Sequence, residues 1–197
     1  DNSVQLFSDS GAQVLHCLQR GRGNQLCQGL HEAAGDAVLI LHADVLPDKD
    51  VVGKISAALA QDEDLVGGAL GAQFQSPKFK YKVITFLNQL RVALSGISFG
   101  DQGQFFRREL VLRGNSLPSI PLMEDVELAM NLQALGKVRL LDGGLNVSVR
   151  RWKTKNVWNN AFHIFFLLSR YLLLRRFKRS LKVDKFYKAY YKGKETA

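Results

Sequence analysis

The sequence lacks a long hydrophobic run, because no stretch reaches the roughly 18–20 apolar residues that a membrane-spanning helix requires. No signal peptide is visible either. Cysteine is scarce: Cys17 and Cys27 are the only two, and their spacing matches neither a zinc site nor a C-x-x-C pair. These absences exclude a disulfide scaffold, and we expect two reduced thiols in a cytosolic protein without a membrane-spanning helix.

Acidic residues are nearly missing from the last quarter of the chain. Residues 150–197 contain 14 Lys and Arg against 2 acids, whereas residues 1–149 contain 13 against 16. With 197 residues, 46% of them hydrophobic, the chain is long enough for one domain with a substantial core. The basic end indicates an anionic partner, which is a membrane surface, a nucleic acid or a phosphorylated substrate.

Apolar runs and helical periodicities alternate along the first 140 residues, which favours an α/β fold. Three glycines in residues 66–74 indicate a strand that lies close to another backbone or a ligand. The expected strands cover residues 12–18, 38–41, 66–74, 138–141 and 145–149, and the expected helices cover residues 24–34, 47–60, 78–94, 108–112 and 124–136.

An unbroken apolar run at residues 38–41 predicts a fully buried strand of a parallel sheet. His42, Ala43 and Asp44 follow it directly. Acids at the carboxyl ends of such strands lie where open α/β sheets bind ligands. The alternative is that Asp44 caps a helix that begins near Pro47.

A second acidic motif, Glu124 and Asp125, opens a predicted helix. Acids at this position also interact favourably with the helix dipole, which is the simpler explanation. Together with Asp44, however, they offer one carboxylate for a divalent cation and one to accept a proton. The departure of a phosphate leaving group needs both, and carboxylate oxygens suit Mg²⁺ or Mn²⁺.

The motifs occur in an order that resembles glycosyltransferase family 2: G-R-G-N-Q, L-H-A-D, G-D-Q-G-Q-F-F-R-R, P-L-M-E-D-V-E-L and R-R-W. Within the family the sequence is most similar to the bacterial radical-SAM/selenodomain-associated transferases, over about residues 10–152. The resemblance implies a Rossmann-like GT-A fold with a mixed, mostly parallel sheet flanked by helices. It also implies a nucleotide-sugar donor, a divalent cation and inversion at the sugar carbon. We expect a catalytic domain over residues 1–152 and a basic, aromatic-rich helix and tail over residues 153–197.

By this resemblance, Asp44 matches the position of the family's D-x-D motif that contacts the metal and the diphosphate. His42 replaces the first acid, either as a ligand or as a hydrogen-bonded histidine at a strand end. Asp125 matches the catalytic base and Glu124 its supporting neighbour. The implied donor-binding residues are Arg20, Arg22, His42, Asp44, Gly100, Asp101, Gln102, Arg151 and Trp152.

Several of these residues have simpler explanations. Arg20 and Arg22 suit a diphosphate, but they also suit a solvated loop. Asp101 lies in a glycine loop that matches the segment closing over sugar and acceptor, and an Asx turn would equally explain it. Arg151 and Trp152 would clamp the leaving diphosphate or face a membrane.

The start of the chain departs from the family pattern. Family 2 proteins begin with a strand and a P-x-x-N-E-type loop that hold the nucleotide base, and neither precedes residue 12. We therefore expect an N-terminally incomplete catalytic domain, whose own activity is in question.

Residues 156–178 are dense in aromatics and leucine and are followed by basic residues. This pattern predicts an amphipathic helix in a membrane interface, or one packed on the domain or on a second subunit. Tyrosines alternate with lysines in the tail, but no nucleic-acid module precedes them, so nucleic acid is disfavoured.

The leading hypothesis is a glycosyltransferase of the hexosyltransferase type, peripheral to the inner face of a membrane. Its acceptor is unknown, with a lipid-linked acceptor and a homodimer both open. The alternative is a catalytically degenerate GT-A domain that serves as a membrane-associated binding module. A nucleotidyltransferase on a similar sheet ranks third.

Overall fold

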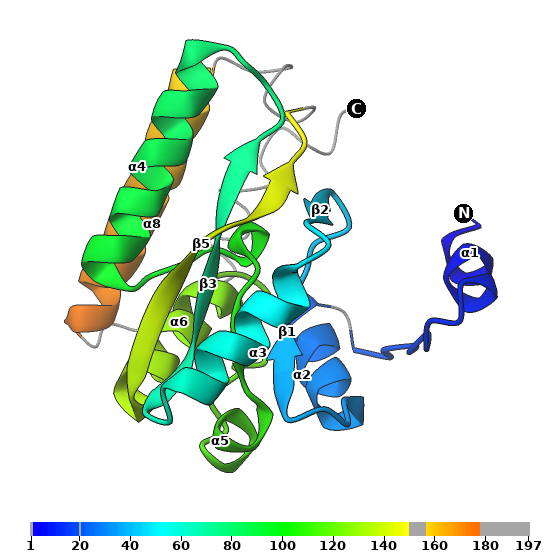
Figure 1. The fold of residues 1–197 in the computed structure, drawn as a ribbon. Coiled ribbons are helices and arrows are strands. Elements are labelled where there is room, and N and C mark those ends of the chain that lie inside the picture. The colour runs from blue at the N-terminus through cyan, green and yellow to red at the C-terminus, as the bar shows by residue number, and fades with distance from the viewer. Residues whose placement is uncertain (1, 20, 150–156, 178–197) are drawn as a thin grey trace.

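The computed structural model describes residues 2–19, 21–149 and 157–177. A five-stranded sheet forms the centre, helices cover both of its faces, and α1 stands away from the body (Figure 1). The strands are β1 (Ala37–Leu39), β2 (Val45–Pro47), β3 (Leu65–Phe74), β4 (Phe105–Arg107) and β5 (Lys137–Val147). The helices are α1 (Ser3–Asp9), α2 (Arg22–Glu32), α3 (Val51–Gln61), α4 (Phe79–Ser95), α5 (Arg108–Arg113), α6 (Glu124–Leu135) and α8 (Val157–Arg176), with a 3-10 turn η1 (Gly100–Gln102).

The strand order is β1-β4-β3-β5-β2. Only β3 and β5 pair in parallel, while β4 and β2 run against their neighbours. Consequently β1, β3 and β5 share one direction. The predicted α/β class, a mixed sheet flanked by helices, is confirmed, although the antiparallel pairings outnumber the parallel one.

The glycines of β3 let three strands approach closely. A Cβ on Gly67 would lie 2.4 Å from the carbonyl oxygen of Phe105, and one on Gly68 would lie 1.8 Å from that of Arg139. The prediction of a strand close to other backbones is therefore confirmed. The two strands expected at residues 138–149 are instead one strand, β5, whose register against β3 shifts between Leu141 and Gly144.

Three other expectations are wrong. Residues 12–18 form no strand. β1 is not a fully buried central strand, because it pairs only with β4 among the described strands and is half-exposed. Pro47 ends β2 instead of opening a helix, and α3 begins four residues later. A proline is tolerated there because β2 pairs with a single neighbour, β5, in the described sheet.

Alternation along β4 sends successive side chains into two cores. Phe105 packs with α3 on one face of the sheet. Phe106 packs on the other face, where α2, α5 and α6 lie. Both rings are fully buried. These two cores fix the carboxyl end of β1, the start of α2 and the start of α6 against one sheet.

A further layer of two helices covers α6 and the ends of the long strands (Figure 1). Leu167, Leu168 and Tyr171 of α8 pack on Val126 of α6, and Val157 packs on α4. The C-terminal helix therefore forms as predicted, with one side packed on the domain. The helical periodicity of residues 78–94 predicts that Leu87 and Leu90 lie on the apolar, buried side of α4, but both are exposed. Within the described residues, no helix is both long enough and apolar enough to cross a bilayer.

Candidate active site

The start of α6 is sharply turned. Met123, which precedes the helix, has a left-handed backbone (φ 67°), an arrangement that a side chain with a Cβ rarely adopts. The turn places Glu124 and Asp125 at the positive end of the helix dipole. Their environments differ, because the side chain of Glu124 is 2% exposed and that of Asp125 is 15% exposed.

Backbone groups hold the carboxylate of Asp125 at both oxygens. Oδ2 accepts the N–H of Gly100 (2.8 Å), and Oδ1 accepts the N–H of Val126 (2.9 Å). The buried side chain of Gln104 donates to the carbonyl oxygen of Asp125 (2.8 Å). This acid therefore has a fixed orientation at the edge of the sheet, with η1 directly beside it.

Arg22, the first residue of α2, joins the acids to the end of β1. Its Nε lies 2.8 Å from Oε1 of Glu124, and its Nη2 lies 4.0 Å from Oδ2 of Asp125. The same Nη2 contacts Nε2 of His42. Gly100 leaves room for this arrangement, because a Cβ there would lie 1.9 Å from Nη2 of Arg22 and 2.5 Å from Nε2 of His42.

Asp44 lies in the turn between β1 and β2, and Asp101 lies in η1. Burial raises the pKa of Asp101 to about 6, with repulsion from Asp125 and Asp44 adding to the rise and Arg91 and Arg22 opposing it. Burial and then repulsion from Asp125 raise the pKa of Glu124 to about 7, against the attraction of Arg22. We call Asp44, Asp101, Glu124, Asp125 and Arg22 the acidic centre.

Arg91 is a residue of this region that the sequence analysis missed. It donates to the carbonyl oxygen of Ile97 (2.5 Å) and to Oε1 of Gln102 (2.8 Å), and it stacks 3.8 Å from the ring centre of Phe99. Burial lowers its pKa to about 10, so it remains a cation at neutral pH. Its only signal in the sequence is that it is the one charged residue of α4 after Lys82, which does not reveal its contacts.

Gln102 is fixed by the same contacts. Its Oε1 also accepts the N–H of Phe99 (3.0 Å), and only 3% of the residue is exposed. The amide nitrogen Nε2 is buried and has no hydrogen-bond partner among the described residues. A buried donor of this kind is costly unless a ligand oxygen completes it.

The acidic centre offers carboxylate oxygens as ligands for a divalent cation. In the described part of the chain, no three His, Cys, Asp or Glu side chains lie close enough to hold a metal by themselves. Mg²⁺ is commonly held by one or two carboxylates and completed by substrate phosphates. Asp125 and Asp44 both repel the negative charge of Asp101, which a cation nearby would relieve, so the donor set fits an ion brought with a diphosphate.

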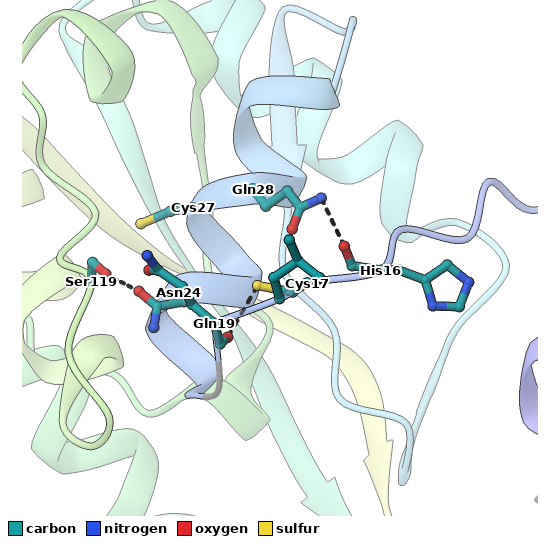
Figure 2. A pocket seen from close by; sticks show the side chains of 8 residues that line it. His16, Cys17, Gln19, Asn24, Cys27, Gln28 and Ser119 are labelled. Carbon is teal, nitrogen blue, oxygen red and sulfur yellow. Dashed lines mark hydrogen bonds between the residues drawn. The ribbon is translucent and has the colours of Figure 1, made fainter.

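A separate open hollow of about 380 Å³ lies beside α2, between residues 16–19 and Ser119 (Figure 2). Both cysteines line it and are free thiols. Cys17 donates to the carbonyl oxygen of Gln19 (3.2 Å), and Cys27 donates to that of Leu117 (3.3 Å). None of the predicted site residues that the structure describes lines this hollow.

The structure thus brings most of the predicted site together at one edge of the sheet. Arg22, His42, Gly100 and Asp125 are in direct contact, and Asp44 and Asp101 lie within electrostatic reach. Arg20, Arg151 and Trp152 lie outside the described residues, as does the predicted boundary at residues 152–153.

Comparisons with known proteins identify the family and a similar fold. The sequence profile described as "Glycosyl transferase family 2" matches residues 1–116, whereas no curated protein matches the chain. TarS residues 1–349 from S. aureus, solved with UDP-GlcNAc, has a similar fold (TM-score 0.51, 14% identity, 76% of this chain and 47% of that one). Glucosyl-3-phosphoglycerate synthase from Mycobacterium tuberculosis, solved with Mn²⁺ and UDP-glucose, matches with a TM-score of 0.49, 18% identity and coverage of 75% and 55%. The chain spans about half the length of these structures.

Proposed function

Because the chain belongs to glycosyl transferase family 2, we propose that it moves a sugar from a nucleotide-sugar donor to an acceptor hydroxyl with inversion. The acceptor oxygen bonds to the sugar carbon while the bond from that carbon to the diphosphate oxygen breaks. The hydroxyl proton passes to an enzyme carboxylate, and the nucleoside diphosphate leaves.

Asp125 is the general base in this proposal. The observation that supports it is the contrast between the two acids that open α6. Glu124 is buried and paired with Arg22, whereas Asp125 is partly open and is oriented by two backbone N–H groups. Each carboxylate oxygen has two lone pairs, so Asp125 keeps capacity for a proton. Glu124 supports it by holding Arg22 in place.

The donor diphosphate is proposed to lie between Asp44, Arg22 and η1. Arg22 and His42 offer N–H groups, and the buried Nε2 of Gln102 offers one more. Asp44 would hold Mg²⁺ or Mn²⁺, which supplies positive charge to the leaving diphosphate when bound. Asp101 and the predicted Arg20, Arg151 and Trp152 complete the proposed donor site.

The proposal also includes predictions about the subgroup, the substrates, the location, the assembly and the domain division. They are membership of the radical-SAM/selenodomain-associated subgroup, a hexosyl donor, a lipid-linked acceptor, peripheral attachment to the inner face of a membrane, a homodimer, and the division into residues 1–152 and 153–197. The basic, aromatic-rich C-terminal sequence supports a membrane location.

Calorimetric titration of UDP and of GDP, each with and without Mn²⁺, tests the donor site. We expect metal-dependent binding of one nucleotide that Asp44→Ala abolishes. Asp48→Ala is the matched control, because Asp48 directly follows β2 and accepts a hydrogen bond from Asn146, a residue outside the acidic centre. Binding that is indifferent to the metal and to Asp44 would contradict the assignment.

One observation favours the second candidate, a catalytically degenerate domain that acts as a membrane-associated binding module. His42 stands where the family has an acid and is engaged by Arg22. If neither nucleotide binds with or without Mn²⁺, while the protein still binds lipid vesicles, this second function replaces the first.

A further inference from the structure

Two neighbouring helices, α4 and α8, carry apolar stripes that point away from the body. On α4 the exposed residues are Phe79, Phe86, Leu87, Leu90 and Leu94. On α8 they are Trp158, Phe162, Phe165, Phe166 and Leu173, and the exposed Phe177 directly follows the helix. Spacings of three, four and seven residues place each set on one side of its helix. We call these two stripes together the α4–α8 face.

The two stripes belong to one surface. Tyr81 and Ile84 of α4 pack against Val157 of α8, and both helices run along the same flank of the molecule (Figure 1). The exposure is large: Phe79 and Leu94 are each 79% exposed and Phe162 is 72% exposed. Soluble proteins rarely leave an apolar surface of this extent open unless something docks on it.

The charge of the two helices identifies the partner. Neither helix contains an acidic residue, whereas each contains three Lys or Arg; of these six, Arg91 is bound to Gln102 and Arg175 to Glu127, away from the face. Lys82, Arg170 and Arg176 are exposed on them. The sequence on both sides of α8 is also strongly basic. Aromatic side chains beside cations, without acids, are typical of surfaces that lie in an anionic lipid interface.

A second copy of the chain fits this face less well. A two-fold dimer would place the face against itself, so that cations would meet cations with no acid from α4 or α8 to pair with them. We propose that α4 and α8 together form the surface by which the protein lies on an anionic lipid bilayer, with α4 contributing as much as the C-terminal helix. The surface does not depend on glycosyl transfer, although it specifies the membrane attachment proposed above.

Vesicle binding of the full chain tests the surface. The protein is mixed with vesicles of phosphatidylcholine alone or of phosphatidylcholine with phosphatidylglycerol, and binding is measured by sedimentation. A separate sample for fluorescence carries Trp152→Phe, which leaves Trp158 as the only tryptophan, because the sequence contains two; the sedimentation and UDP measurements keep Trp152. We expect binding to the anionic vesicles, a blue shift of Trp158 emission, and loss of affinity from about 0.1 M to about 1 M salt as screening increases.

Single substitutions then distinguish the contributions of α4 and α8 to vesicle binding. Phe86→Ser on α4 and Phe162→Ser on α8 should each lower the partition coefficient, and the pair should lower it at least about tenfold. The matched control is Leu46→Ser with Val52→Ser, which removes two exposed apolar side chains far from the face in β2 and α3. UDP binding without vesicles should be unchanged in both pairs, so failure of the surface is distinguishable from failure of the donor site.

Equal vesicle binding by the face pair and the control pair would overturn the proposal, because the basic tail alone would then explain binding. An unchanged partition coefficient in Phe86→Ser alone would restrict the surface to α8 and overturn the role given to α4. A dimer in solution that the face pair converts to a monomer, without vesicle binding, would identify a second copy as the occupant instead.

Discussion

The acidic centre and the α4–α8 face differ in how their side chains are held. In the acidic centre, backbone N–H groups fix the carboxylate of Asp125, Arg22 pairs with Glu124, and Gly100 leaves room for Arg22. On the α4–α8 face, the large side chains are exposed and no acid of either helix balances the cations. The acidic centre depends on the orientation of its side chains, whereas the α4–α8 face depends on its composition. Moving a single group should therefore change the function of the acidic centre, whereas the function of the face should follow its total apolar area and charge.

The largest expected effect follows from replacing the proposed base, Asp125→Asn. The amide cannot accept the acceptor proton at neutral pH, so transfer should fall by about 10²–10⁴-fold. Donor binding should be retained, because the diphosphate is proposed to contact other residues. Transfer kinetics and UDP titration of the same preparation measure the two effects. Full transfer activity in this variant would exclude Asp125 as the base.

The next largest effect should come from Gly100→Ala. The added Cβ would lie 1.9 Å from Nη2 of Arg22, so the guanidinium must leave its place between His42 and Glu124. Displacement of about 1 Å at such a centre can reduce transfer by about 10²-fold. Gly53→Ala is the control, because its Cβ would have no atom within 4 Å, and it should keep full activity. Equal rates in both variants would show that Arg22 need not be held there.

Sequence reasoning selected the residues of the acidic centre by their place beside secondary-structure elements and by the family resemblance. His42 and Asp44 follow a short apolar run, and Glu124 and Asp125 open a helix. In the structure, Arg22 contacts both His42 and these two acids. Sequence reasoning could not find Arg91 or Gln104, because their roles depend on contacts with residues 97–102 and 125 that no local pattern encodes.

The same reasoning misjudged the sheet's edges. The apolar run at residues 38–41 looked central, yet in the described sheet β1 pairs only with β4. Pro47 looked like a helix start, yet pairing with β5 makes it the end of β2. Apolar runs report burial in general, but which strand is central depends on long-range pairing. The exposed side of α4 has the same cause, since Leu87 and Leu90 are as apolar as the residues buried on its other side.

A smaller effect is expected in the pH dependence of stability. The pKa of Glu124 is raised from its ordinary 4.5 to about 7, so the folded protein binds this proton more tightly than the unfolded chain does. The resulting stability is fully present below about pH 4.5 and is lost as the pH rises through 7. The melting temperature of Glu124→Gln should therefore decline less between pH 5 and pH 8, by a few degrees. Parallel curves for parent and variant would show that Glu124 does not titrate in this range.

The smallest effect should appear at the contact that joins the two regions. Tyr171 and Arg175 of α8 both donate to Oε1 of Glu127 in α6 (2.7 Å each). Tyr171→Phe removes one donor but leaves the arginine, so Glu127 remains paired and the loss should be about 1 kcal/mol. Differential scanning calorimetry should show a fall of about 2–4 °C. Transfer should be unchanged, because the backbone N–H groups that orient Asp125 come from Gly100 and Val126. If transfer instead falls while the melting temperature holds, then α8 positions the first turn of α6, and the two regions act as one.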